Sequence, residues 1–287
     1  MKILIQIYMV IFMLNLLEID GFFMYNTFFN LYRRMTTKKN KEISNNIIQN
    51  VRVKTIKNPN RLIKYNSTNK VIISTPSGLN GFYLLGVSTY IKENFDLSNY
   101  IYSGASAGAW NSLFLAFKGN NTEFINLLLD SNIHNATSVI KIENTMNELI
   151  LNNYSEDDFE LDKINIGVSI LKWFFKFNLN VYNDFTSLND TLECCMASSH
   201  IPFITGGLLR FYRNRCCFDG GFFKYPYVNN TPIFTIKPDL WNSTYTTSSF
   251  LGNILQMNKL NVNLTELYIQ GYNDTKNNHA YLTTIFL

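Results

Sequence analysis

Ser106 is the residue with the clearest potential for covalent chemistry in this chain of 287 residues. It is the centre of a Gly-Ala-Ser-Ala-Gly turn, residues 104–108, which separates a short apolar run from a stretch with helical spacing. A G-x-S-x-G sequence between a strand and a helix is typical of a nucleophile elbow, because Gly104 and Gly108 permit the cramped backbone that exposes the hydroxyl. A serine hydroxyl is a weak nucleophile at neutral pH, so another group has to accept its proton.

Asp219 is one candidate for that proton acceptor. It stands in residues 213–221, which we interpret as a strand that ends in a turn, and the glycines Gly220 and Gly221 follow it directly. Glycines let such a strand end approach another backbone without a Cβ clash. An ordinary Asp-Gly turn has the same sequence. Asp219 is therefore a candidate base only in combination with the other motifs.

The three histidines are the other candidates, and one of them leaves a second interpretation open. Ser106, Asp219 and His279 follow the chain order Ser, Asp, His of the α/β-hydrolases, which is compatible with a catalytic triad. The sequence Ser-Ser-His-Ile-Pro around His200 favours a histidine at a helix end or at the edge of the core. His134 lies in an Asn-rich loop that carries no signal for chemistry.

The surrounding pattern predicts the elements that must hold these residues. Strand-like runs alternate with helix-like runs and with glycine-bearing turns: we predict strands at 70–75, 99–103 and 163–171 and helices at 82–94, 109–117 and 189–198. Alternation of this kind indicates an α/β fold with an open, mostly parallel sheet. In such sheets, sites lie outside the carboxyl ends of the strands, so the turns at 76–81 and 104–108 should lie close together.

Three motifs in this order give the chain a resemblance to the patatin-like phospholipase family. They are the glycine-bearing turn at 76–81, the elbow at 104–108 and the Asp-Gly-Gly at 219–221. The likeness runs from about residue 70 to 228, and it includes an Ala-Ser-x-x-x-Pro segment within 196–204 and a proline, Pro226, after the last motif. The resemblance implies a three-layer α/β/α sandwich with a mostly parallel central sheet. It also implies a lipid acyl hydrolase that uses a Ser–Asp dyad without histidine, metal or cofactor.

Carried over to these positions, the resemblance implies roles for particular residues. Ser106 is the nucleophile and Asp219 takes its proton, while the backbone amides of Gly78, Leu79 and Asn80 form the oxyanion hole. Gly81 is a further motif glycine. The loop departs from the family pattern, because Pro76 and Ser77 stand where two glycines are usual and Asn80 stands where a basic residue is usual. Proline also lacks an N–H group, so this loop has one possible oxyanion donor fewer than the family pattern.

A function without catalysis stays open beside the Ser–Asp dyad and the Ser-Asp-His triad. An apolar leader with a basic flank on a chain rich in aromatic residues is also compatible with a protein that binds membranes without turnover. The net charge of +4 is mild and the basic residues form no known binding motif, so nucleic acid is not expected as a partner. The expected partner is a lipid substrate at a membrane surface, and the need for a protein activator is left open.

The sequence predicts three successive segments. Residues 1–35 are expected to be a hydrophobic leader, either a signal or a membrane anchor, 36–65 a polar basic linker, and 66–287 the hydrolase domain. A basic cluster after the leader favours the cytosolic side, whereas Asn-x-Ser/Thr sequons suit the lumen, so the side of the membrane stays open. The four cysteines occur as two adjacent pairs without metal-site spacing, which indicates free thiols.

Overall fold

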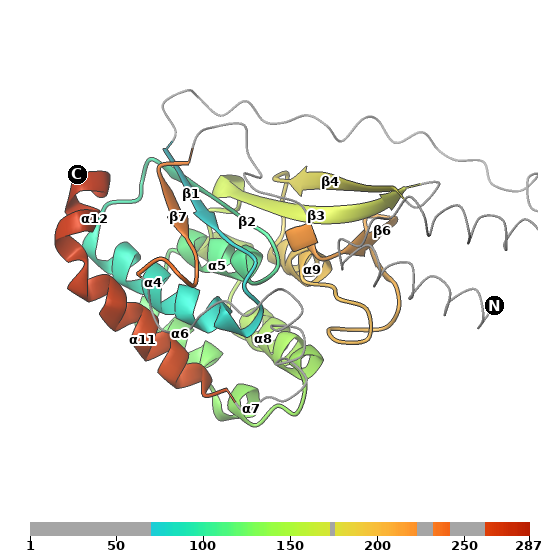
Figure 1. Ribbon diagram of the computed structural model, residues 1–287. Helices are drawn as coiled ribbons and strands as arrows, with labels where there is room; N and C mark the ends of the chain where they lie inside the picture. Colours follow the sequence, from blue (N-terminus) through green and yellow to red (C-terminus); the bar gives the residue numbers. More distant parts are fainter. Residues whose placement is uncertain (1–69, 173–175, 223–231, 242–261) are drawn as a thin grey trace, which may run out of the picture. The chain divides into compact units, whose positions relative to one another are not determined.

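The structure is a computed structural model, and it describes residues 70–172, 176–222, 232–241 and 262–287. The described strands form one sheet in the order β5-β6-β3-β2-β1-β7, with β4 paired to β3 (Figure 1). Their bounds are β1 Lys70–Ser74, β2 Tyr100–Gly104, β3 Ile164–Lys172, β4 Lys176–Tyr182, β5 Arg210–Tyr212, β6 Arg215–Phe218 and β7 Phe234–Ile236.

The centre of the sheet is parallel, as predicted. β1 pairs in parallel with both β2 and β7, and β2 pairs in parallel with β3. The other half is antiparallel, because β4 and β6 both run against β3 and β5 runs against β6. The molecule is therefore an α/β protein with a mixed sheet, and the antiparallel part was not expected from the sequence.

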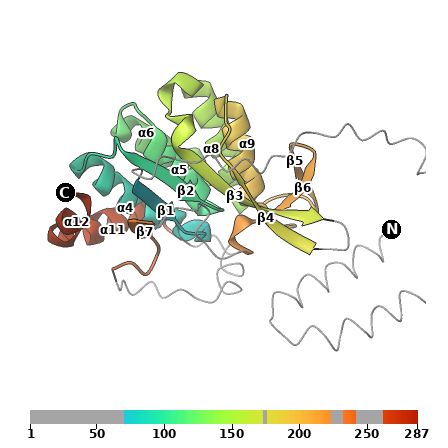
Figure 2. The same cartoon turned by 90° about the horizontal axis from the view of Figure 1, so that it is seen from above.

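The helices connect and cover these strands. Figure 1 shows α4, α5 and α9 beneath the sheet, and Figure 2 gives the view from above. The α-helices have the bounds α4 Gly81–Asn94, α5 Ala107–Ala116, α6 Asn121–Leu128, α7 Ser131–His134, α8 Val139–Asn153, α9 Leu188–Ser198, α11 Leu264–Asn277 and α12 His279–Phe286. The short 3-10 helices are η1 Gly78–Asn80, η2 Glu156–Asp158, η3 Leu161–Lys163 and η5 Gly220–Phe222.

The predicted elements that flank the motifs are confirmed in type. The predicted strands at 70–75, 99–103 and 163–171 correspond to β1, β2 and β3, and the predicted helices at 82–94, 109–117 and 189–198 correspond to α4, α5 and α9. The segment between 118 and 162 carried no predicted element, yet it contains α6, α7 and α8. These helices matter for function because α8 forms one wall of the pocket described below.

The two faces of the sheet are buried differently. Alternation along β1 directs Ile72 toward the main hydrophobic core, whereas Val71 and Ile73 join Ile101 of β2 in a separate buried cluster. The main core also contains most of the buried apolar side chains of α4, α5 and α9. Both faces of β1 and β2 are thus removed from water, as expected for central strands of a parallel sheet.

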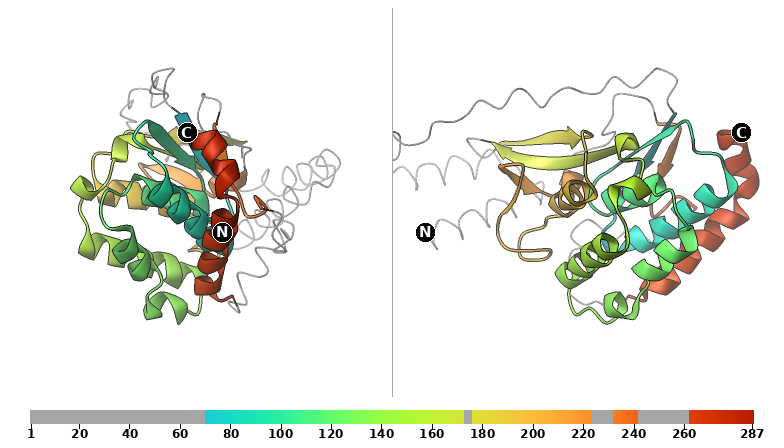
Figure 3. Two further views of the ribbon diagram at one scale, coloured as in Figure 1. Left: turned by 90° about the vertical axis from the view of Figure 1, so that its left-hand side faces the viewer. Right: turned by 180° about the vertical axis from the view of Figure 1, so that it is seen from behind.

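The C-terminal helix α11 packs closely on α4, and both helices are seen side by side in Figure 3. A Cβ atom added at Gly86 would lie 2.1 Å from the carbonyl oxygen of Tyr268, and one added at Gly271 would lie 2.0 Å from that of Tyr83. The two glycines therefore let the helix backbones approach each other. The Tyr83 hydroxyl also donates a hydrogen bond to Asp274.

The cysteines are free thiols, as the sequence indicates. Cys194, Cys195 and Cys217 are buried and Cys216 is half-buried, and none forms a disulfide. Burial raises the pKa of all four thiols. Thiols of this kind are inert packing groups rather than nucleophiles.

The predicted leader, 1–35, and linker, 36–65, lie outside the described residues. Among the helices that the structure describes, none combines the length and the apolarity needed to cross a membrane.

Lys92 provides a test of how the helix that carries the candidate nucleophile is stabilised. Its Nζ donates to the carbonyl oxygens of Phe114, Leu115 and Phe117 at the C-terminus of α5. Replacing Lys92 by Met keeps the apolar stem but leaves these carbonyls without their donor, so we expect the free energy of unfolding to fall by about 2 kcal/mol. Urea denaturation measures this loss. The exposed Lys118 is the matched control, where Lys118→Met should change stability by less than about 0.5 kcal/mol, and equal losses in both variants would contradict the capping role.

Candidate active site

Ser106 occupies a strained turn between β2 and α5. Its backbone has φ 54° and ψ −130°, a region that residues with a Cβ atom rarely adopt. Two glycines make this turn possible: a Cβ atom at Gly104 would lie 2.2 Å from the carbonyl oxygen of Gly108, and one at Gly108 would lie 2.0 Å from that of Ser74. The strain and the close packing are the geometry that a nucleophile elbow requires.

Asp219 reaches the elbow because the turn after β6 also packs in direct contact with the neighbouring backbone. A Cβ atom at Gly220 would lie 2.1 Å from the carbonyl oxygen of Gly167 in β3 and 2.7 Å from the Cβ atom of Ala105. A Cβ atom at Gly221 would lie 2.8 Å from that of Pro76. The three predicted motifs therefore meet at one place, although they are far apart in the sequence.

The Ser106 hydroxyl acts directly on the Asp219 carboxyl as a hydrogen-bond partner that lowers its pKa, and no imidazole lies between the two side chains. Both residues are buried, with 6% of Ser106 and 1% of Asp219 exposed. Burial raises the pKa of the Asp219 carboxyl to about 6, and hydrogen bonds from Ser106 and from the Gly221 amide oppose this rise. A carboxylate with such a pKa is still ionised at neutral pH but accepts a proton more readily than an ordinary aspartate.

Neighbouring polar groups fix the positions of these two residues. The amide of Ser106 donates to the Ser198 hydroxyl at 2.9 Å, and this hydroxyl donates to the carbonyl of Gly167 at 2.6 Å. The amide of Asp219 donates to the carbonyl of His200 at 2.8 Å, and the Ser169 hydroxyl donates to the Asp219 carbonyl at 2.7 Å. The Ala-Ser-x-x-x-Pro segment noted in the sequence thus contributes Ser198, which connects the elbow to β3.

The predicted oxyanion loop lies beside the elbow as the short helix η1. Gly81 touches the turn, because a Cβ atom there would lie 2.8 Å from the Cβ atom of Ala107. The amide of Asn80 donates to the carbonyl of Ser77 at 3.1 Å, so it is already in use. The amides of Gly78, which has φ 54°, and of Leu79 have no acceptor among the described residues. Two of the three predicted donors therefore remain available.

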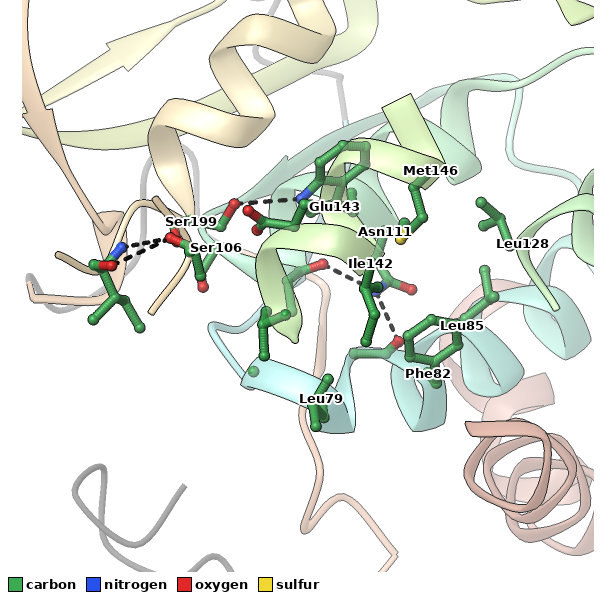
Figure 4. A pocket seen from close by; sticks show the side chains of 17 residues that line it. Leu79, Phe82, Leu85, Ser106, Asn111, Leu128, Ile142, Glu143, Met146 and Ser199 are labelled. Atoms are coloured by element: carbon green, nitrogen blue, oxygen red, sulfur yellow. Dashed lines mark hydrogen bonds between the residues drawn. The ribbon is translucent and has the colours of Figure 1, made fainter. Parts of the chain in front are cut away.

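A pocket opens next to Ser106, and Figure 4 shows its side chains. Its walls come from η1, α4, α5, α6, α8 and the loop after α9. The lining is mainly apolar and includes Leu79, Phe82, Leu85, Leu128, Ile142 and Met146. Its polar side chains are Ser106, Asn111, Glu143, Ser199 and Thr205, together with the indole of Trp110.

The histidine rings have partners other than the side chains of Ser106 and Asp219. His279 Nδ1 is 3.0 Å from the Tyr90 hydroxyl, and its ring stacks on Phe95 at a centroid distance of 5.5 Å. His200 is buried at the end of α9, where it contributes its main-chain carbonyl to Asp219. His134 Nε2 is 2.7 Å from the Thr265 hydroxyl. The structure therefore brings Ser106 and Asp219 together and leaves His279 with partners on α4.

Sequence reasoning missed Glu143, which lines the pocket from α8. The buried residues of α8 are Val139, Ile142, Glu143, Met146 and Ile150, which follow one helical stripe. A carboxylate inside an apolar stripe is a detectable signal, but it requires the helix to be recognised first.

The residues present are a hydroxyl on a strained turn, a buried carboxyl bonded to it, and backbone amides in the wall of an apolar pocket. This set is suited to nucleophilic attack on a carbonyl and to stabilisation of the resulting oxyanion. Among the described residues, no group of three or more His, Cys, Asp or Glu side chains is placed to hold a metal ion.

Comparison of the sequence with protein-family models and with curated proteins gives no match.

Proposed function

We propose that this protein is a lipid acyl hydrolase that cleaves fatty-acyl esters with a Ser106–Asp219 dyad. One observation carries the proposal: the buried Asp219 carboxyl interacts directly with the hydroxyl of Ser106 on its strained turn. A hydroxyl on a strained elbow needs a base, and Asp219 is the titratable group that touches it. The family resemblance of the three motifs supports the same assignment.

The proposed reaction has two steps. Ser106 Oγ attacks the ester carbonyl as its proton passes to Asp219, and the C–O bond to the alcohol then breaks as this proton is delivered to the leaving oxygen. The product is an acyl-enzyme on Ser106. Asp219 next takes a proton from water, the hydroxide attacks the acyl-enzyme, and the fatty acid leaves as Ser106 recovers its proton. The amides of Gly78 and Leu79 stabilise the oxyanion in both steps.

A lipid substrate is supported by the walls of the pocket. The apolar side chains beyond Ser106 give an acyl chain a surface that excludes water, whereas a polar substrate would leave its groups unpaired there. A three-layer α/β/α sandwich belongs to the same proposal. It is supported by the second buried cluster of Val71, Ile73 and Ile101, on the face of the sheet opposite the main core.

The alternatives receive less support. A triad would need His279 near Asp219, but its ring engages Tyr90 and Phe95. A membrane-binding protein without turnover has no physical need for a carboxyl bonded to a strained serine. Attachment to a membrane through residues 1–35 stays a prediction, since that segment lies outside the described residues.

A fluorophosphonate reagent tests the proposal directly. It phosphonylates an activated serine, so we expect one covalent adduct per chain, located on Ser106 by peptide mass spectrometry. Ser106→Ala should abolish labelling. Ser112 is the matched control, because its hydroxyl is buried and donates to the carbonyl of Gly108, and Ser112→Ala should leave labelling intact. A folded protein that is not labelled at Ser106 would overturn the assignment.

A further inference from the structure

Glu143 is a buried carboxyl for which the dyad has no use. It lies in the buried stripe of α8, between Ile142 and Met146 in sequence position, and only 6% of it is exposed. An apolar residue would fill this position without the cost of removing a carboxyl from water. Packing alone would favour an apolar side chain at this position. A carboxyl there indicates a hydrogen-bond partner that offsets the cost of its burial.

The position of Glu143 is inside the pocket that contains the candidate nucleophile. It is the one ionisable side chain among the described residues that line this pocket. In Figure 4 it lies on the Ser106 side of the apolar residues Met146 and Leu128. Glu143 and these apolar residues line the same pocket as Ser106, so an acyl chain attached at Ser106 shares this pocket with the Glu143 carboxyl.

The hydrogen bonds around Glu143 leave part of its capacity unused. It is hydrogen-bonded to Ser199. The Ser199 hydroxyl donates to the Cys195 carbonyl at 2.9 Å and lies 3.5 Å from the donor Trp110 Nε1. The single Ser199 proton is therefore shared between the Cys195 carbonyl and the Glu143 carboxyl, and Glu143 accepts from Ser199 with one oxygen. No second hydrogen-bond partner of the Glu143 carboxyl occurs among the described residues, so the carboxyl keeps capacity for a ligand in the pocket that it lines.

The other polar side chains of the wall are committed to the protein. The amide nitrogen of Asn111 donates to the carbonyls of Gly81 and Ala107, and its oxygen accepts from Ser88. The Thr205 hydroxyl donates to the Ser199 carbonyl and accepts from the Ile201 amide. Glu143 is thus the wall group best placed to bind a polar atom of a ligand.

Burial keeps Glu143 protonated at neutral pH. Burial raises its pKa to about 8, against the hydrogen bond from Ser199 and the attraction of Arg210 on β5, while the charge of Asp219 adds to the rise. Arg210 is itself paired with Glu193 at 2.9 Å. Cys195, on the neighbouring helix α9, is a buried thiol whose own pKa is raised. A neutral carboxyl both accepts and donates hydrogen bonds, which suits a hydroxyl group.

We propose that Glu143 forms a polar subsite in the acyl pocket, which selects acyl chains that carry a hydroxyl group over plain alkyl chains. This inference rests on the proposed function, because it takes the pocket to hold the acyl chain. A hydroxyl bound to Glu143 pairs with a carboxyl oxygen that a plain alkyl chain leaves unpaired. A pocket with such a polar group favours the ligand that carries the hydroxyl by about tenfold or more in affinity.

The test measures binding rather than turnover. The Ser106→Ala protein is titrated by calorimetry with ethyl octanoate and with a series of its analogues in which a single hydroxyl moves along the chain. We expect at least one hydroxylated ester to bind about tenfold tighter than ethyl octanoate. Adding Glu143→Leu should remove or reverse this preference, and adding Glu143→Gln should retain part of it. Met146→Leu is the control, because it alters the wall without changing its polarity and should keep the preference.

The possible results separate this subsite from the function on which it rests. Equal binding of plain and hydroxylated esters, or a preference that survives Glu143→Leu, overturns the subsite and leaves the acyl pocket in place. If no ester binds, the subsite and the acyl pocket of the proposed function are both overturned.

Discussion

The Asp219→Asn protein is expected to lose at least about 10³-fold in kcat/KM for a short-chain ester. Asparagine has nearly the shape of aspartate and keeps an oxygen for the Gly221 amide, which is 2.7 Å from Asp219 Oδ1. It cannot take the proton of Ser106, however, and no other titratable side chain is bonded to that hydroxyl in the described structure. Ser106→Ala should cause a loss of at least the same size. Initial rates on a fluorogenic ester measure both effects.

The pH dependence of the wild-type protein belongs to the same prediction. Asp219 must be ionised to act as a base, and burial raises its pKa to about 6. Activity should therefore rise through a pH of about 6 and fall as the carboxyl is protonated below it. Whatever activity remains in Asp219→Asn should lack this acid limb, because asparagine does not titrate.

His279→Ala provides the control for both variants. Its ring contacts Tyr90 and Phe95 instead of the dyad, so the variant should keep kcat/KM within about threefold of the wild type. Loss of activity in His279→Ala together with Ser106→Ala would contradict the dyad and favour a triad. Full activity in Asp219→Asn would contradict the role of Asp219 in either mechanism.

The Gly108→Ala protein is expected to lose about 4 kcal/mol or more in its free energy of unfolding. The Cβ atom of the alanine would lie 2.0 Å from the carbonyl oxygen of Ser74. Neither atom is at the end of a flexible side chain, so the clash can be relieved only by moving the backbone. β1 and α5 would have to separate, which opens the core of the domain. Denaturation in urea, followed by circular dichroism, measures the loss.

Gly207→Ala is the matched control for this substitution. A Cβ atom at Gly207 would have no neighbour within 4 Å among the atoms of the protein. The change in stability there should stay within about 0.5 kcal/mol. If both glycine variants are equally stable, the close packing of the elbow against β1 is wrong.

Local sequence patterns predicted the elements around the site well. β1, α4, β2 and α5 follow from apolar spacing and from the glycines between the runs, which are properties of short segments. The antiparallel strands were not predictable in this way, since β3 and β6 pair through residues such as Ile170 and Cys217, which are distant in the sequence. The helices from 121 to 153 were missed because their apolar stripes are interrupted by polar residues, including Glu143.

The sequence by itself determined which residues are available for chemistry, namely Ser106 on its elbow, Asp219 before two glycines and the loop of Gly78 and Leu79. It left open whether Asp219 or His279 meets the serine. The tertiary structure decided that contact, as well as the engagement of the Asn80 amide by Ser77 and the presence of Glu143 in the pocket wall. The physical reason is that hydrogen bonding and burial arise where separate segments pack together, and a local pattern contains no information about which segments those are.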